Sequence, residues 1–169
     1  NTTGVSNTSI GTTSLESNTT GDYNNAIGRS LNSNTTGTRN IAVGNNALDA
    51  ADTENDNLAI GYDALGAAIA GGEFNAALGN YALDALTSGD GNVAIGYGAI
   101  TAVTTGDANV SIGRASGGTI TTGSNNTVIG KGADVSASGA SNQIVIGKSA
   151  TGQGDNYAVI GNADVTRLY

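Results

Sequence analysis

The sequence predicts an all-β solenoid of about ten short coils. Three observations predict it: a tripeptide motif that recurs ten times, the nearly constant spacing of its copies, and the asparagine and glycine columns beside it. Each motif is a small or β-branched residue, an aliphatic residue and a glycine. The aliphatic residues, taken as position 0, are Ile10, Ile27, Val43, Ile60, Leu78, Ile95, Ile112, Ile129, Ile146 and Ile160. Successive copies lie 14 to 18 residues apart, and a fixed period under about 20 residues is typical of a solenoid or fibre.

Residues around position 0 alternate with the period of two that a β-strand requires. Position 0 is β-branched in nine of the ten copies, and position −2 is often apolar, as in Ile41 and Val93. We therefore expect positions −2 and 0 to point into the coil interior. Position −1 is small in the first seven copies and valine in the last three, which predicts a close approach by another backbone and a later change of cross-section. The residues expected to be buried, each beneath its equivalent in the next coil, are Ile27, Val43, Ile60, Leu78, Ile95, Ile112, Ile129 and Ile146.

Glycines mark two bends in each coil. A glycine follows position 0 in all ten copies, and a second glycine stands near position −6 in eight of them. Such invariance indicates either a positive φ or a lack of room for a Cβ atom.

An asparagine column at position −3 predicts a ladder of stacked amides between coils, about 4.8 Å apart. The alternative is that asparagine only tolerates the turn geometry there. The ladder residues are Asn7, Asn24, Asn40, Asn57, Asn75, Asn92, Asn109 and Asn126, and Gln143 and Tyr157 complete the column.

The chain divides into two parts by its corners. Residues 1–105 form the regular repeats of about 17 residues, in which a small residue and Leu or Ile occupy positions +4 and +5, as in Ala47-Leu48. This pattern lapses after Ile112. Residues 106–169 are therefore interpreted as a continuing roll with altered corners and an exit segment.

The composition argues against several classes of protein. Six Tyr, one Phe and no Trp or Met leave too few large side chains for a compact globule, so stacked coils and neighbouring chains must share apolar faces, which predicts an oligomer. A net charge of −8 argues against nucleic acid or an anionic membrane as the main partner. No stretch of the sequence approaches the roughly 18 apolar residues of a membrane span.

The sequence predicts no enzyme, no cofactor and no metal site. It contains no His and no Cys, which removes the imidazole base, the thiol nucleophile and the usual transition-metal ligands. Acidic residues at position −5 are expected on exposed turns rather than in the pocket that glycoside cleavage needs. Calcium at Asp52, Glu54 and Asp56, or at stacked Asp90 and Asp107, is the alternative, but no known calcium-loop spacing is present.

One column suggests a binding surface. Position +2, just past the glycine bend, gathers four of the six basic residues and two of the six tyrosines. Tyrosine offers a stacking face to a sugar ring, and Arg or Lys binds carboxylates. The candidate ligand-binding residues are Tyr62, Tyr97, Arg114, Lys131 and Lys148. The alternative is a solvated face whose Arg and Lys residues bridge to acids on the next chain.

The repeats also resemble known fibres. Asn92-Val93-Ala94-Ile95-Gly96 and Asn126-Thr127-Val128-Ile129-Gly130 resemble the head repeat of YadA-like trimeric adhesins, and the unit from Asn40 to Asn57 looks still more like the repeats of phage tail fibres. The resemblance implies a left-handed parallel β-roll, with three identical chains wound about one axis. Most intervals are longer by one corner than the usual adhesin repeat, whose length only the interval from Ile146 to Ile160 matches.

The expected function is that of a structural and attachment protein: the trimeric shaft or head of a phage tail fibre, extracellular on the virion, which mediates or supports binding to a host glycan or receptor. The segment Ile160–Tyr169 resembles the exit segment that precedes a chaperone domain in phage fibres, which favours this origin over the head of a bacterial trimeric autotransporter adhesin on the cell surface. An ice-binding solenoid is a further alternative. Its Thr pairs, such as Thr104-Thr105, are interrupted at Ala70-Gly71.

Overall fold

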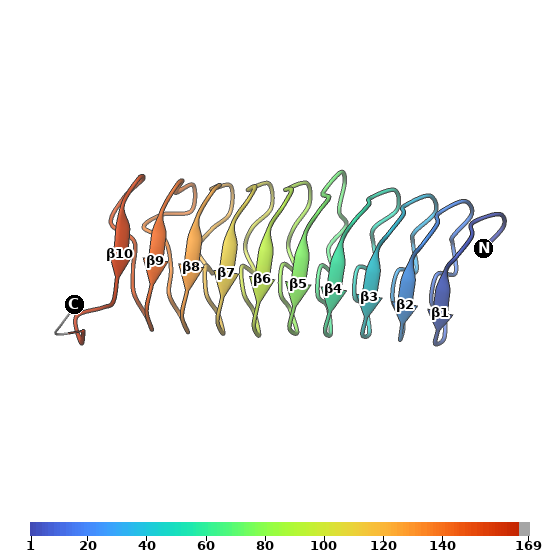
Figure 1. Cartoon of the computed structure of the whole chain (residues 1–169), viewed down its shortest axis with the longest axis horizontal. Coiled ribbons are helices and arrows are strands. Elements are labelled where there is room, and N and C mark those ends of the chain that lie inside the picture. Colours follow the sequence, from blue (N-terminus) through green and yellow to red (C-terminus); the bar gives the residue numbers. More distant parts are fainter. Residues whose placement is uncertain (166–169) are drawn as a thin grey trace.

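The computed structural model describes residues 1–165 and shows an all-β solenoid of about nine turns, as the repeats predict. Ten strands of three residues form one parallel sheet in sequence order along the rod (Figure 1). The strands are β1 (Thr8–Ile10), β2 (Asn25–Ile27), β3 (Ile41–Val43), β4 (Leu58–Ile60), β5 (Ala76–Leu78), β6 (Val93–Ile95), β7 (Val110–Ile112), β8 (Thr127–Ile129), β9 (Ile144–Ile146) and β10 (Ala158–Ile160).

The register of the sheet is that of the repeat. Each position 0 pairs with position 0 of the next coil, as Ile95 pairs with Ile112, and the neighbouring positions pair in the same way. The sheet continues from β6 to β7 with the same pairing as elsewhere, so the change near residue 105 leaves the sheet unbroken. Every repeat position therefore forms a column along the rod.

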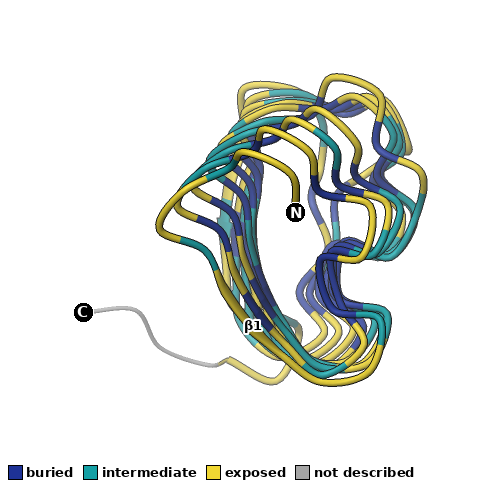
Figure 2. Ribbon diagram, turned by 90° about the vertical axis from the view of Figure 1, so that its right-hand side faces the viewer, coloured by how far each residue is buried: buried dark blue, intermediate teal, exposed yellow. Residues whose placement is uncertain are grey.

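The prediction that positions −2 and 0 point into the coil is wrong. Of the residues expected there, Ile27, Leu78, Ile95 and Ile112 are exposed. Val43, Ile60, Ile129 and Ile146 are half-buried. Position −1 is the inward one: Ala26, Ala42, Ala59, Ala77, Ala94, Ser111, Val128 and Val145 have no exposed surface. Figure 2 shows each strand as one wall of the coil, with buried residues on that wall and a second row of buried residues on the facing wall.

Leucines from the opposite wall fill the interior beside these small residues. Leu48, Leu65, Leu83 and Ile100, all at position +5, are completely buried, and they share the core with the alanines at −1. A large side chain at both positions would overfill so narrow a space. When the +5 residue becomes Gly117 and then Asp134 and Thr151, the next inward strand residues become valine, which restores the lost volume.

The glycine after position 0 meets both conditions that the sequence left open. Gly96 has a φ of 132°, and a Cβ atom built on it would lie 2.7 Å from the carbonyl oxygen and carbon of Gly113 in the next coil. At the second corner Gly106 meets only the second condition. Its φ is not positive, but a Cβ atom there would lie 2.1 Å from the carbonyl oxygen of Gly123. Close stacking of backbones leaves no room for a side chain at Gly96 or Gly106, although Glu54 and Ala140 take the second-corner position in two other coils.

The asparagine column forms a hydrogen-bonded ladder between coils. Asn109 is typical: its Oδ1 accepts the backbone N–H of Asn126 at 3.1 Å, and its Nδ2 donates to the carbonyl of Gly123 at 2.8 Å. Direct amide-to-amide bonds also run from Asn126 down to Asn57, at 2.9 to 3.3 Å. Because these amides are buried, the ladder satisfies polar groups that would otherwise be costly to bury.

Candidate functional site

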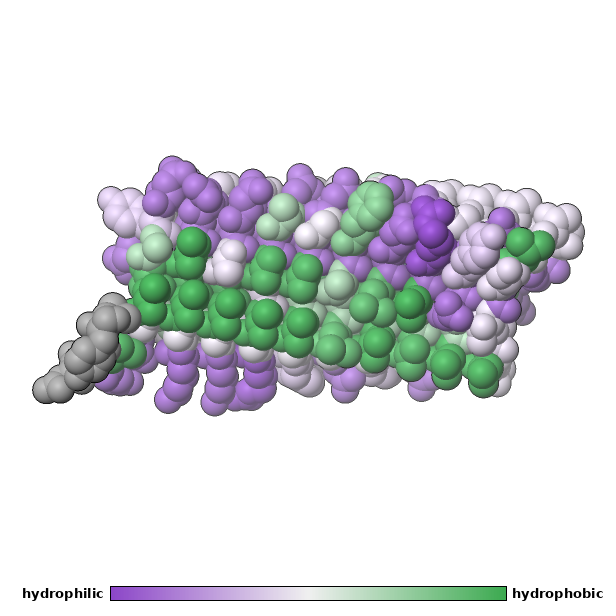
Figure 3. Space-filling model, viewed as in Figure 1, coloured by the Kyte–Doolittle hydropathy of each residue, from purple (hydrophilic) through white to green (hydrophobic). Residues whose placement is uncertain are grey.

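The most prominent surface is a continuous apolar band along the sheet, which we call the outer face and define as the side chains at positions −2 and 0. Figure 3 shows it running the length of the rod between hydrophilic margins. Ile41, Leu78, Ile95, Ile112 and Ile144 are between 37% and 44% exposed. No residue in these two columns is buried. Ten coils about 4.8 Å apart and a strand width of about 10 Å give the face an extent of roughly 450 Å².

The face is bordered by a corner at each end of its strands, and the two corners differ in charge. The upstream corner, positions −5 and −4, is called the acidic edge. Its six carboxylates are Asp22, Asp56, Glu73, Asp90, Asp107 and Asp155, against the single base Arg39. The downstream corner, positions +2 and +3, is called the basic edge. Its four bases are Arg29, Arg114, Lys131 and Lys148, against the single acid Asp63.

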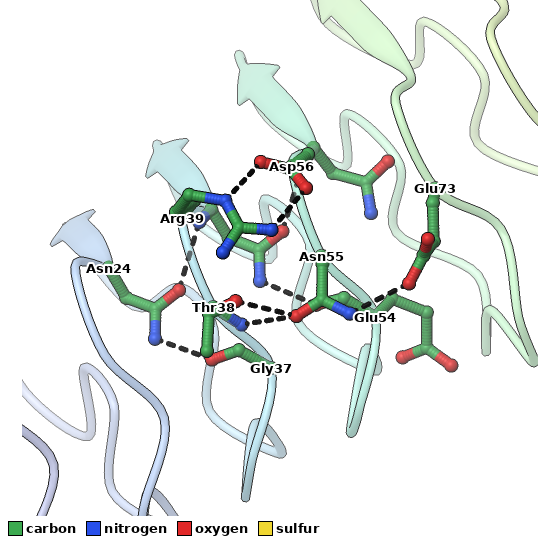
Figure 4. A network of polar contacts seen from close by, with 10 residues as sticks. Asn24, Gly37, Thr38, Arg39, Glu54, Asn55, Asp56 and Glu73 are labelled. Carbon is green, nitrogen blue, oxygen red and sulfur yellow. Dashed lines mark hydrogen bonds and ion pairs between the residues drawn. The ribbon is translucent and has the colours of Figure 1, made fainter.

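Hydrogen bonds between coils hold the acidic edge in place. The Asp90 carboxylate accepts the backbone N–H of Glu73 at 2.8 Å, and that of Asp107 accepts the N–H of Asp90 at 2.9 Å. Figure 4 shows the same arrangement earlier in the column, where Asn55 accepts the N–H of Thr38 at 2.9 Å and donates to Glu73 at 2.7 Å. The acids at −5 therefore have one oxygen fixed within the chain and the rest of the carboxylate in solvent.

The single base of the acidic edge is already paired within the chain. Arg39 Nε and Nη2 donate to the two carboxylate oxygens of Asp56, each at 2.6 Å (Figure 4). These hydrogen bonds lower the pKa of Asp56 and raise the pKa of Arg39. The remaining charge of this edge is consequently all negative.

Backbone hydrogen bonds also order the basic edge. The carbonyl of Arg114 accepts the N–H of Gly132 at 3.0 Å, and that of Lys131 accepts the N–H of Ser149 at 2.9 Å. The predicted site residues Arg114, Lys131 and Lys148 thus lie in one exposed column, one per coil. Within residues 1–165 their side chains form no ion pair, whereas Arg29 lies 3.8 Å from Asp49.

Tyrosines form the other part of this edge. The predicted residues Tyr62 and Tyr97 are 43% and 57% exposed, and both contact Tyr81 edge to face, with ring centroids 5.4 Å and 5.8 Å apart. The structure therefore joins the two through a third ring, which we include in the tyrosine cluster (Tyr62, Tyr81 and Tyr97). Partial burial, followed by the charges of its neighbours, raises the pKa of Tyr81. Tyr81 was not among the predicted residues because it belongs to position +3, although its place between Tyr62 and Tyr97 in successive coils was a usable signal.

The carboxylates gather into no metal-binding group. Among residues 1–165 no cluster of three or more acidic side chains could hold a metal ion. Glu54, buried near Asp52, accepts the backbone N–H groups of Asp52, Thr53 and Gly71 at 2.8 to 3.0 Å. Its buried charge is satisfied by the chain itself.

The threonine column of the ice-binding alternative is engaged in coil contacts. The hydroxyls of Thr87 and Thr104 donate to the carbonyls of Thr104 and Thr121, at 2.9 Å and 3.3 Å. Positions Ala70 and Gly71 interrupt the column, as the sequence shows.

Comparisons with protein-family models, with curated proteins and with solved structures found no match to this chain. Residues 1–165 contain no helix that is long and apolar enough to cross a membrane. The exit-segment resemblance falls partly on residues 166–169, which lie outside the described residues.

Proposed function

We propose that this chain is the shaft or head of a homotrimeric fibre, and that the outer face is the surface through which its copies pack. The observation that carries the proposal is the band of exposed and half-buried side chains on one side of the rod, which are β-branched or aliphatic at every position of the outer face except Asn25 (Figure 3). Contiguous apolar surfaces above a few hundred Å² mark interaction sites, and this band repeats in every coil. Three copies around one axis bury all three bands at once.

The fibre belongs, in this proposal, to a phage tail and holds a tip away from the virion. The resemblance of the repeats to phage tail fibres is the basis for that origin, with the head of a bacterial adhesin as the alternative. A slender coil with a narrow core of alanine and leucine gains much of its apolar burial from neighbouring chains.

The mass of the assembly in solution tests the proposal. We expect native mass spectrometry and sedimentation to give three times the 16.5 kDa of one chain. Replacing Ile95 and Ile112 by serine removes apolar contacts from every copy and is expected to shift the species toward monomer. Replacing the same two residues by valine, which already occupies this column at Val43, is the matched control and should leave the trimer intact. A stable wild-type monomer with full strand content would overturn the proposal.

We propose further that the tyrosine cluster contacts a host-surface saccharide. Three rings in successive coils present aromatic surface along about 10 Å, which suits the apolar faces of two or three sugar units. Threefold symmetry presents the cluster three times, so weak contacts add through multivalency.

Attachment is measured with the Tyr62→Ser and Tyr97→Ser double variant. We expect at least a tenfold loss of adsorption to host cells or of signal on a glycan array, with an unchanged oligomer mass. Tyr157→Ser removes a tyrosine of similar exposure, 61%, far from the cluster and serves as control. Unchanged attachment in an intact oligomer would refute the saccharide contact while leaving the fibre proposal standing.

A further inference from the structure

The two corners that border the outer face carry opposite charge, and this has consequences for how copies meet. The acidic edge has six acids and one paired base, and the basic edge has four bases and one acid. Both edges are exposed along the rod, at opposite ends of the same strands (Figure 2). Any copy that packs on the outer face must therefore bring its own two edges alongside these two.

The symmetry of the assembly decides which edges meet. Rotation about an axis parallel to the solenoid turns a second copy so that its basic edge lies against the acidic edge of the first. Rotation about an axis along the strands makes the second copy antiparallel to the first. The two acidic edges then lie against each other, and so do the two basic edges. Parallel packing of two, three or more copies therefore brings opposite charges together, whereas antiparallel packing brings like charges together.

We propose that the four bases on the basic edge of one copy, which lie on either side of the tyrosine cluster, pair with carboxylates on the acidic edge of the next copy, and that this pairing fixes the chains parallel about the fibre axis. The inference rests on the proposed self-association through the outer face and adds its orientation and its charged contacts. The partner is a second copy of this chain.

Rotation about a single axis places equivalent coils of the copies level with one another, and oppositely charged residues then meet on two of the coils. Asp22 and Arg29 border the same strand, β2, and Asp107 and Arg114 border the same strand, β7. Without an axial shift, Arg29 of one copy faces Asp22 of its neighbour, and Arg114 faces Asp107. Only one carboxylate oxygen of each acid accepts a backbone N–H within the chain, which leaves the other oxygen for a partner.

The two lysines fit the same arrangement less directly. Lys131 and Lys148 stand level with Ser124 and Ser141, and each lies one coil, about 4.8 Å, from an acid of the opposite edge, Asp107 or Asp155. A lysine side chain spans that distance. Individual exposed ion pairs contribute little to affinity, so the sum of several pairs, together with like-charge repulsion in the reversed packing, selects the orientation.

Cysteine cross-linking tests the orientation. The sequence contains no cysteine, so each introduced thiol is the only one in its chain. We propose two single variants at opposite ends of the outer face, Ile27→Cys and Ile146→Cys, each treated with a short bis-maleimide. In a parallel, in-register assembly each variant cross-links to itself. Cross-linking only in a mixture of the two variants would show an antiparallel packing and overturn the inference.

A double-mutant cycle tests the charged contacts. Asp107→Asn removes the charge but keeps an oxygen for the Asp90 N–H, and Arg114→Gln removes the opposite charge. At low salt we expect each single variant to lower the association constant about two- to fivefold per contact. The double variant is expected to lower it no more than a single variant does. Additive effects, or effects that 1 M salt leaves unchanged, would refute the pairing. A monomeric wild-type chain would instead refute the proposed function, and an oligomer without these signatures would refute this inference alone.

Discussion

Replacing Gly96 by alanine is expected to destabilise the solenoid by about 3 kcal/mol or more. Two physical effects add. The φ of 132° at Gly96 lies where a residue with a Cβ atom is strained, and the new Cβ would overlap the carbonyl group of Gly113, 2.7 Å away. That neighbour is backbone in a stacked coil, so it cannot rotate aside as a side chain would.

Denaturant unfolding followed by circular dichroism measures this effect at fixed protein concentration. Gly118→Ala is the matched control, because no heavy atom lies within 4 Å of a Cβ built there and its φ is not in the left-handed region. The control is expected to unfold at the wild-type midpoint. If Gly96→Ala and Gly118→Ala unfold together, the close stacking of the glycine corners is not a determinant of stability.

Replacing Asn109 by alanine is expected to cost about 2 to 4 kcal/mol, because it opens the middle of the ladder. The Asn126 backbone N–H loses its acceptor, and the Gly123 carbonyl loses the donor from Nδ2. The Asn126 side chain also loses its bond to Asn109 Oδ1 at 2.9 Å. All these groups are buried between coils, where water cannot replace the missing partner without opening the stack.

Hydrogen exchange of the Asn126 amide reports the loss directly, beside the unfolding midpoint. We expect faster exchange at that amide in Asn109→Ala than in the wild type. The control is Thr105→Ala, which removes an exposed hydroxyl from the same coil without touching the ladder. Equal destabilisation by the two variants would mean that the ladder amides contribute no more than surface polar groups.

Several features of the fold follow from the sequence because they repeat. The strands lie at the ten motifs, and their register follows from the period, since equal spacing places like residues opposite one another in neighbouring coils. The glycine corners were predictable because a glycine that recurs at one repeat position indicates that a Cβ atom is excluded there, although the backbone that excludes it belongs to the next coil. The asparagine column was equally visible, although its partners in the next coil, such as the Gly123 carbonyl, were not.

The residue types of the +2 column were also predictable from the sequence, but the contacts between their side chains were not. The sequence placed Tyr62 and Tyr97 in one row, whereas the ring that joins them, Tyr81, comes from position +3. Tyr81 adopts a φ of 60°, in the left-handed region, as does Asp63 at the same repeat position. Backbone conformation in a turn depends on packing that a pattern of residue types does not contain.

The direction in which each strand faces was decided only by the tertiary structure. Alternation with a period of two divides the strand residues into two sets but does not indicate which set faces the coil interior. Hydrophobicity pointed to Ile95 and its column, yet the interior has room only for Ala94, because Ile100 from the opposite wall already fills it. Ile100 itself is completely buried and lies in a left-handed conformation, φ 48°, which β-branched residues rarely adopt. The sequence by itself thus determined the repeat, the register and the corners, which recur at fixed positions. The apolar outer face emerged only from the volume of the coil, which depends on the side chains of the facing wall, such as Ile100, that already fill it.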